Sequence, residues 1–245
     1  MWLLYWLLYG AILNMEHGFT WYQWIPGLEN KPHWVIGSSL VFLLVMIFSL
    51  LFAKKLKKRS SILVPDKHIS LLSFFDFVVE KLLTLAETVM GKDGKKYFPL
   101  VGTLFIYIFV SNLLGLIPGL LPPTDSLNTN LACSLVVFLF YNYQGLKEHG
   151  LSYLKHFMGP VIWLAPIMVV IEVVSHLVRP LSLSIRLFGN ISGDHLVLGI
   201  FSSLVPVGIP IIFLFLGLFV SFIQAFVFTL LSMVYISLAT AHEEH

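Results

Sequence analysis

The chain has 245 residues, of which 58% are hydrophobic and only 11% are charged, against about a quarter in an ordinary soluble domain. Its net charge of +2 is too small to favour nucleic acid as a partner, and no basic run is interleaved with aromatic residues. The composition predicts an all-α, multi-pass membrane protein that forms a single membrane domain over residues 1–245, with the lipid bilayer as its surroundings.

The amino-terminal part of the chain predicts one transmembrane helix. Residues 1–13 are apolar and aromatic, but at about 1.5 Å per residue they are too short to cross a hydrocarbon core of about 30 Å. We therefore expect residues 1–32 to form an external, interfacial segment. Residues 34–53 carry no charge and predict the first span. The basic run KKLKKR at 54–59 follows, which places the end of this span in the cytoplasm and the amino terminus outside.

Residues 69–90 are as long as a span but carry a polar stripe from end to end. The stripe has spacings of 3, 4, 4 and 3 residues and consists of Ser73, Asp76, Glu80, Thr84 and Glu87. This pattern favours an amphipathic helix on the cytoplasmic side over a membrane-spanning one.

The next two spans are predicted over residues 98–119 and 129–146, joined by a loop that contains no lysine. The second of them returns to Lys147 and Lys155, so that positive charge again lies on the inner side. Asn112, inside the earlier span, is interpreted as a helix-packing residue rather than a transport group.

The last two spans are predicted over residues 160–196 and 207–240. Each holds 30 or more residues, roughly 45–50 Å of helix against about 30 Å of hydrocarbon. They must tilt beyond the usual range of up to about 40°, bend at Pro180 or Pro210, or both. We expect a long, strongly tilted hairpin whose carboxyl terminus is cytoplasmic, which makes five spans in all.

Strongly polar side chains form a second stripe along residues 160–196. At about 100° per residue they project within an arc of roughly 80°. They are Glu172, His176, Arg179, Arg186, Asn190 and Asp194. An arginine in hydrocarbon costs about 2.5–3.5 kcal/mol and therefore normally faces a water-filled cavity or a partner. The stripe predicts an ion or proton pathway, although a packing role stays open for His176 and Arg179.

Three motifs carry a family resemblance: SNLLGLIPG at 111–119, PLSLSIRLFGN at 180–190 followed by His195, and IQAFVFTLLSMVYISLA at 223–239. In order and spacing they resemble subunit a of the F-type ATP synthase, from about residue 33 onward. The resemblance implies a proton-translocating stator subunit in a bacterial inner membrane. Its partners would be a ring of c subunits, the b subunits of the peripheral stalk and the soluble catalytic sector. No ATP site, cofactor or metal is expected in this chain, which would not be catalytic alone.

The resemblance also implies residue roles. Arg186 would face the ring carboxylates, and Asn190 and Gln224 would line the path near it. Glu172, Ser175 and Ser182 fall on positions that are polar in the family. Arginine suits its place on physical grounds, because a guanidinium stays protonated when partly desolvated and so attracts a carboxylate without passing a proton on.

The position of each polar residue along the predicted helix indicates to which of the two half-channels it belongs. Glu172 lies near the cytoplasmic end and is a candidate for the inner one, whereas Asn190, Asp194 and His195 belong to the outer one. A buried Gln224 without a partner would cost about 1–3 kcal/mol, so we expect it to meet Arg186 or Asn190. Ordinary polar packing between helices is the alternative for Gln224.

The chain departs from the family pattern at Gly217, where many members place an acidic or histidine side chain. A carboxylate that would partner His195 is therefore missing. Asp194 could compensate, but the two side chains point about 100° apart on an ideal helix. A shared role would require the helix to loosen at Gly189 and Gly193.

Two other classes of protein fit the sequence less well. A self-contained ion channel or secondary transporter would show paired repeats or discontinuous helices, and none is visible. An intramembrane enzyme would need a motif such as G-x-S-x-G or H-E-x-x-H, which the chain lacks. The terminal His242 and His245 fit a solvated terminus better than a metal site.

Overall fold

The structure is a computed structural model that describes residues 32–58, 71–117, 119–150, 165–204 and 208–240. All regular elements in these ranges are helical: α2 (His33–Lys58), α3 (Leu71–Met90), η2 (Gly91–Asp93), α4 (Gly94–Leu114), η3 (Pro123–Asp125), α5 (Leu127–His149), α7 (Ala165–Leu204) and α8 (Ile209–Thr240). The predictions for residues 1–32, apart from Pro32, and for the terminal histidines lie outside the described residues.

Four of the described helices, α2, α4, α7 and α8, are long and apolar enough to cross a membrane. The predicted third span forms α5 but is not among these four, since it carries several polar side chains. Those that are buried in the bundle are Thr129, Asn130, Ser134 and Gln144. A membrane crossing by α5 therefore stays a prediction.

The amphipathic character predicted for residues 69–90 is confirmed in α3. Leu82, Ala86 and Met90 are buried in the core that α3 shares with α4, whereas Glu80 and Glu87 are exposed. α3 is also absent from the helices apolar enough to span a membrane.

Three predicted helix ends are wrong. α2 continues to Lys58, five residues beyond the predicted 53. α4 ends at Leu114, not at residue 119, because the chain turns where the Gly115 N–H donates to the Asn112 carbonyl at 3.1 Å and Gly119 takes a φ of +89°. α7 continues to Leu204, eight residues beyond the predicted 196. The apolar residues that follow His195 contain no proline or charge to stop the helix.

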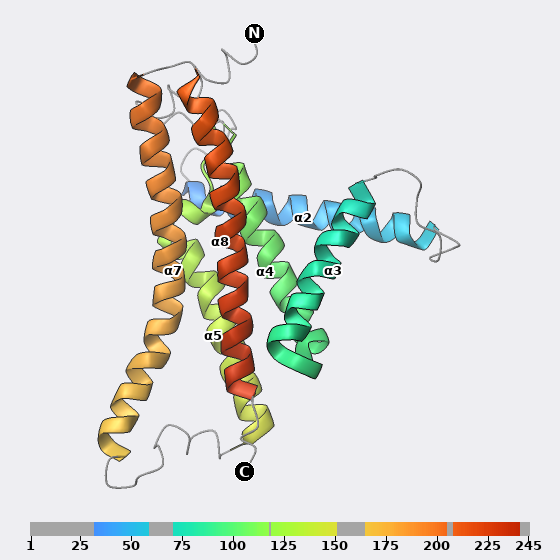
Figure 1. Cartoon of the computed structure of the whole chain (residues 1–245), viewed down its shortest axis with the longest axis vertical. Helices are drawn as coiled ribbons and strands as arrows, with labels where there is room; N and C mark the ends of the chain where they lie inside the picture. The colour runs from blue at the N-terminus through green and yellow to red at the C-terminus, as the bar shows by residue number, and fades with distance from the viewer. Residues whose placement is uncertain (1–31, 59–70, 118, 151–164, 205–207, 241–245) are drawn as a thin grey trace.

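α7 and α8 lie side by side and antiparallel, and α2 runs crosswise to both (Figure 1). α7 continues through Pro180, and its lower part leans away from α8 in the view of Figure 1. Pro210 is the second residue of α8, where a proline is tolerated without a bend. The predicted alternative of a bend at Pro210 is therefore wrong. In α7 the interior Pro180 lacks the backbone N–H that would donate to the preceding turn.

The centre of the bundle is formed by α8, which packs against α4, α5 and α7. Its fully buried side chains include Ile108, Tyr141, Leu187 and Phe228, one from each helix. This core holds α7 with one face against the bundle and the other free, since Leu183 and Leu187 are buried while Leu181 and Ile185 are exposed.

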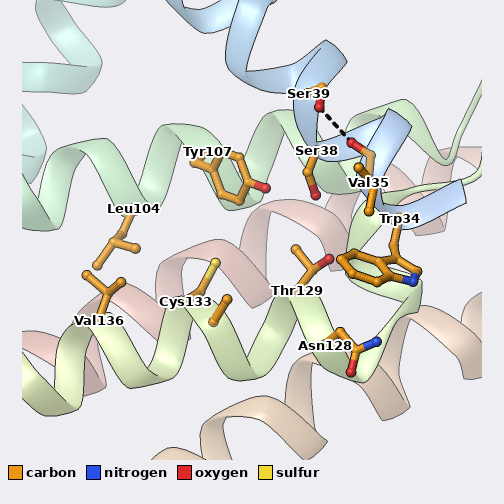
Figure 2. Close-up of a pocket in the computed structure, with 11 residues that line it drawn as sticks. Trp34, Val35, Ser38, Ser39, Leu104, Tyr107, Asn128, Thr129, Cys133 and Val136 are labelled. Atoms are coloured by element: carbon orange, nitrogen blue, oxygen red, sulfur yellow. Dashed lines mark hydrogen bonds between the residues drawn. The ribbon is translucent and has the colours of Figure 1, made fainter. Parts of the chain in front are cut away.

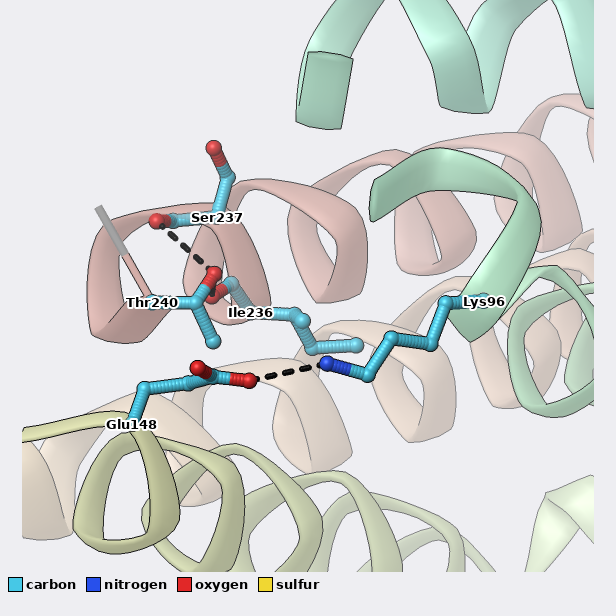
Figure 3. Close-up of polar contacts among 5 residues, drawn as sticks. All are labelled: Lys96, Glu148, Ile236, Ser237 and Thr240. Carbon is cyan, nitrogen blue, oxygen red and sulfur yellow. Dashed lines mark hydrogen bonds and ion pairs between the residues drawn. The ribbon is translucent and has the colours of Figure 1, made fainter. Parts of the chain in front are cut away.

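One end of the bundle gathers the start of α4 and the ends of α3, α5 and α8. Lys96 Nζ lies 2.8 Å from Glu148 Oε1, close to the last turn of α8, in which Thr240 Oγ1 donates to the Ile236 carbonyl at 2.9 Å (Figure 3). Ser237 Oγ donates to the Val89 carbonyl of α3 at 3.3 Å. These contacts agree with the alternating directions predicted for the helices.

Candidate functional site

Arg186 lies on the free face of α7. Its side chain is exposed, as are the apolar side chains of the nearby Ile185 and Phe188. It forms no hydrogen bond or ion pair with any residue that the structure describes. An apolar helix face that carries an unneutralised guanidinium needs a partner from outside this chain, since the charge is costly in lipid.

Asn190, one turn after Arg186, turns to α8. Its Nδ2 atom donates a short hydrogen bond to Oε1 of Gln224, which is 3% exposed. The expected contact between Gln224 and Asn190 is thus confirmed, while Arg186 remains apart from Gln224. The pair crosses the α7–α8 interface at the level of the unneutralised arginine.

Asp194 and His195 reach different parts of the bundle. A Cβ atom placed on Gly217 of α8 would lie 2.6 Å from Oδ2 of Asp194, and one placed on Gly115 would lie 2.8 Å from Nε2 of His195. α7 is continuous through this region, so the loosening at Gly189 and Gly193 that a shared role would require is not present. Asp194 fills space beside a glycine of α8, and His195 fills space beside Gly115 in the turn that follows α4.

A buried polar network lies next to His195. Thr124 Oγ1 donates to Asn112 Oδ1 at 2.8 Å, Asn112 Nδ2 donates to the Ser221 carbonyl at 3.4 Å, and Asn130 Nδ2 donates to the Thr124 carbonyl at 2.8 Å. Asn112 therefore joins α4 to α8 and to η3, in line with its interpretation as a packing residue.

The opposite part of the stripe forms a second cluster. Glu172 Oε1 lies 3.3 Å from His176 Nδ1 and 3.8 Å from Arg179 Nη2. The Arg179 guanidinium carbon lies 5.5 Å from the centroid of the Tyr235 ring, and the His176 and Tyr141 ring centroids are 5.9 Å apart. His176 is buried, and the other two stripe residues are half-buried.

Ser175 and Ser182 are half-buried on α7; Ser175 lies within the range of this cluster, and Ser182 lies between the cluster and Arg186. The 22 residue steps from Glu172 to Asp194 correspond to about 33 Å of helix. The stripe is therefore divided into two clusters, with Arg186 between them.

A cavity of about 390 Å³ opens elsewhere, between α2, α4 and α5 (Figure 2). Its lining is mainly apolar and includes Trp34, Tyr107 and Cys133, without any residue of the α7 stripe. The lining contains no carboxylate, histidine, lysine or arginine, so the cavity is not part of the polar path. Among the described residues no three histidine, cysteine or acidic side chains are grouped to hold a metal ion.

Two contacts escaped prediction from the sequence. Ser192 Oγ donates to Asp125 Oδ1 at 2.5 Å, and Tyr141 lies against His176. Asp125 stands in a loop and is 67 residues from its partner, so no periodicity along one helix could indicate the contact. Tyr141 belongs to a segment whose sequence is typical of an apolar helix, so nothing in that segment indicated a contact with His176.

Comparison with known proteins gives consistent matches. The ATP synthase A chain family matches residues 35–237. ATP synthase subunit a of Bdellovibrio bacteriovorus is 46% identical over 226 residues, which cover 92% of this chain and 99% of that protein. The protein of the same name from Geobacter sulfurreducens is 49% identical over 83% of this chain and 86% of its own length. ATP synthase subunit a 3 of Pelobacter propionicus is 48% identical, over 93% and 100% respectively.

Proposed function

The chain belongs to the ATP synthase A chain family, and from this premise we propose that it is the stator subunit that directs protons across the membrane sector of an F-type ATP synthase. Membership makes it a membrane component of that enzyme. The proposal concerns how this component works: two offset half-channels that meet at Arg186, opposite carboxylates carried by a rotating c ring.

The exposed and unneutralised Arg186 carries the proposal. A carboxylate on the ring that has lost its proton is attracted to the guanidinium, which itself stays protonated. Because the arginine does not pass the proton on, it separates the two half-channels. A proton must then bind to a ring carboxylate and travel with the ring to the other side, and each charge that moves through 100 mV supplies about 2.3 kcal/mol.

The outer half-channel comprises Asn190, Gln224, Asp194 and His195. The Asn190–Gln224 hydrogen bond supports a polar path that begins beside the arginine. The position of the Asp194 carboxylate over Gly217 supports its role as the acidic group that relatives carry on the other helix. Asp194 and His195 then flank the path from two sides instead of sharing one proton.

The inner half-channel comprises Glu172, Ser175, His176 and Ser182. The contacts among Glu172, His176 and Arg179 support a cluster of exchangeable protons at this end of α7. Arg179 differs from Arg186 in having a carboxylate and a tyrosine ring from its own chain as partners. It therefore organises the cluster and does not compete for the ring carboxylates.

The crosswise direction of α2 supports the expected tilt. α2 is long and apolar enough to span the bilayer, and such helices tilt by about 20° on average from the bilayer normal. With α2 in that orientation, the crosswise α7–α8 pair would lie strongly oblique to the bilayer normal (Figure 1). An oblique pair presents the stripe along the curved flank of a ring. Peripheral-stalk b subunits and the soluble catalytic sector complete the assembly, in a bacterial inner membrane with the amino terminus outside and the carboxyl terminus in the cytoplasm.

Replacement of Arg186 tests this function. In inverted membrane vesicles that contain the whole complex, Arg186→Ala should abolish ATP-driven proton pumping, because the ring carboxylate loses its fixed counter-charge. Lys81→Ala, which removes an exposed cation from α3, is the matched control and should pump normally. The chain should also copurify with an oligomer of small hairpin subunits. Normal pumping by Arg186→Ala would refute the proposal.

A further inference from the structure

The connection between α4 and α5 is a rigid platform at the outer end of the proposed path. Thr124 is fully buried and bonded to both Asn112 and Asn130. On the other side, a Cβ atom placed on Gly37 of α2 would lie 3.3 Å from the Pro123 ring. η3 is thereby fixed against α2, α4 and α5, and the carboxylate that follows Thr124 has a defined place.

That carboxylate belongs to Asp125. It is half-buried and accepts the Ser192 hydroxyl at 2.5 Å. No lysine, arginine or histidine among the described residues forms an ion pair with it. Because a carboxylate can accept about four hydrogen bonds, Asp125 retains sites for water. A partly buried acid without a counter-charge is better placed to exchange a proton than to stabilise the fold.

Asp125 also lies beside the residues already assigned to the outer half-channel. Its partner Ser192 precedes Asp194 by two residues and His195 by three. His195 faces Gly115 and Pro122, and a Cβ atom on Gly115 would lie 2.8 Å from both Nε2 of His195 and Cγ of Pro122. The outer turn of α7 and the Pro122–Asp125 platform thus hold three ionisable side chains on facing elements.

We propose that Asp125 is a further proton-carrying residue of the outer half-channel, and this inference rests on the proposed function. The ionised carboxylate takes a proton from outside water and forms an O–H bond. The protonated acid then donates to Ser192 Oγ, whose own hydroxyl proton turns away from Asp125, since a hydroxyl both donates and accepts. When the hydroxyl passes its proton towards Asp194 and His195, it takes the one from Asp125, and the carboxylate is restored.

The test compares Asp125→Asn with Asp125→Ala in vesicles that contain the whole membrane sector, after removal of the soluble catalytic sector. Asparagine keeps an oxygen that accepts the Ser192 hydroxyl but cannot carry a proton. We expect Asp125→Asn to lower passive proton flux about a hundredfold, the lower end of what a positioned proton-transfer group contributes, and Asp125→Ala to lower it at least as much. Asp76→Asn, on exposed α3, is the control and should conduct normally.

Normal flux in Asp125→Asn would overturn the inference, whether or not Asp125→Ala is impaired, because the hydrogen bond alone would then be what matters. If Asp125→Asn does not assemble, Asp125→Glu is compared with Asp125→Gln, which has the same length. Equal flux in these two would also overturn the inference, and flux in the glutamate variant alone would support it. Failure of the proposed function is distinguishable, because Arg186→Ala would then pump normally whatever Asp125 does.

Discussion

Asp194 of α7 places a carboxylate oxygen in the space that a side chain on Gly217 of α8 would fill, 2.6 Å from the position of its Cβ atom. The acidic group and the glycine are therefore matched across the helix pair. In the proposed path, this carboxylate takes the place of the acidic side chain that the family pattern has at the position of Gly217.

This match predicts that the carboxylate can be relocated. Asp194→Gly should lower ATP-driven pumping about a hundredfold, the lower end of what a positioned proton-transfer group contributes, and the second change Gly217→Glu should recover much of it. Gly217→Glu alone should be severely impaired, because its Cβ atom would meet both Asp194 and Leu116 and would bring two carboxylates together.

Pumping in inverted vesicles measures these effects. Gly193→Ala, at a position where a Cβ atom meets nothing within 4 Å, is the control. A double variant no better than Asp194→Gly would contradict the matched pair.

The Asn190–Gln224 hydrogen bond predicts coupling between the two side chains. Removal of either partner leaves a polar group of the other unsatisfied at a cost of about 1–3 kcal/mol, and Gln224 is 3% exposed. Thermal unfolding of the purified complex should show that Asn190→Ala and Gln224→Ala together cost less than the sum of the two single changes. Strict additivity would mean that the bond does not contribute.

The cluster at the inner end predicts that Glu172 and Arg179 depend on each other. Arg179→Ala should impair inner proton exchange, because Glu172 loses its nearest cation and the Tyr235 ring loses the guanidinium. Arg179→Lys should recover it only partly, since an ammonium lacks the planar stacking surface. Passive proton flux measures the effect, with Val173→Ala on the exposed face of the same helix as the control. Equal flux in all three variants would exclude a role for Arg179.

Gly115 predicts a packing defect. In Gly115→Ala the new methyl group would lie 2.8 Å from both the Pro122 ring and the His195 imidazole, and the proline ring cannot rotate away. Overpacking of this kind typically costs about 1–3 kcal/mol. The variant complex should unfold at a lower temperature than the Gly193→Ala complex, and an unchanged transition would show that the loop yields freely.

The sequence predicted those features of the helical bundle that depend on the spacing of residues along a single helix. The amphipathic α3 and the polar stripe on α7 follow from spacing along helices. The contact of Gln224 with Asn190, one of its two expected partners, follows instead from the cost of burying an unpaired amide. What spacing cannot supply is the partner of a loop residue: Asp125 meets Ser192 only because a network of buried side chains fixes η3. The end of α4 was predicted too late because the Gly/Pro-rich turn that follows the helix was counted as part of it. The end of α7 was predicted too early because the apolar residues after 196 were left out.

Cross-linking tests the central claim, that the exposed face around Arg186 meets the carboxylates of a ring. In a Cys133→Ser background, Ile185→Cys is paired with a cysteine introduced next to the ring carboxylate. Phe42→Cys on α2, which is equally exposed at 63% against 59%, is the control. Oxidation should join Ile185→Cys, but not Phe42→Cys, to the ring subunit. Equal cross-linking from both positions, or none from Ile185→Cys, would contradict the account.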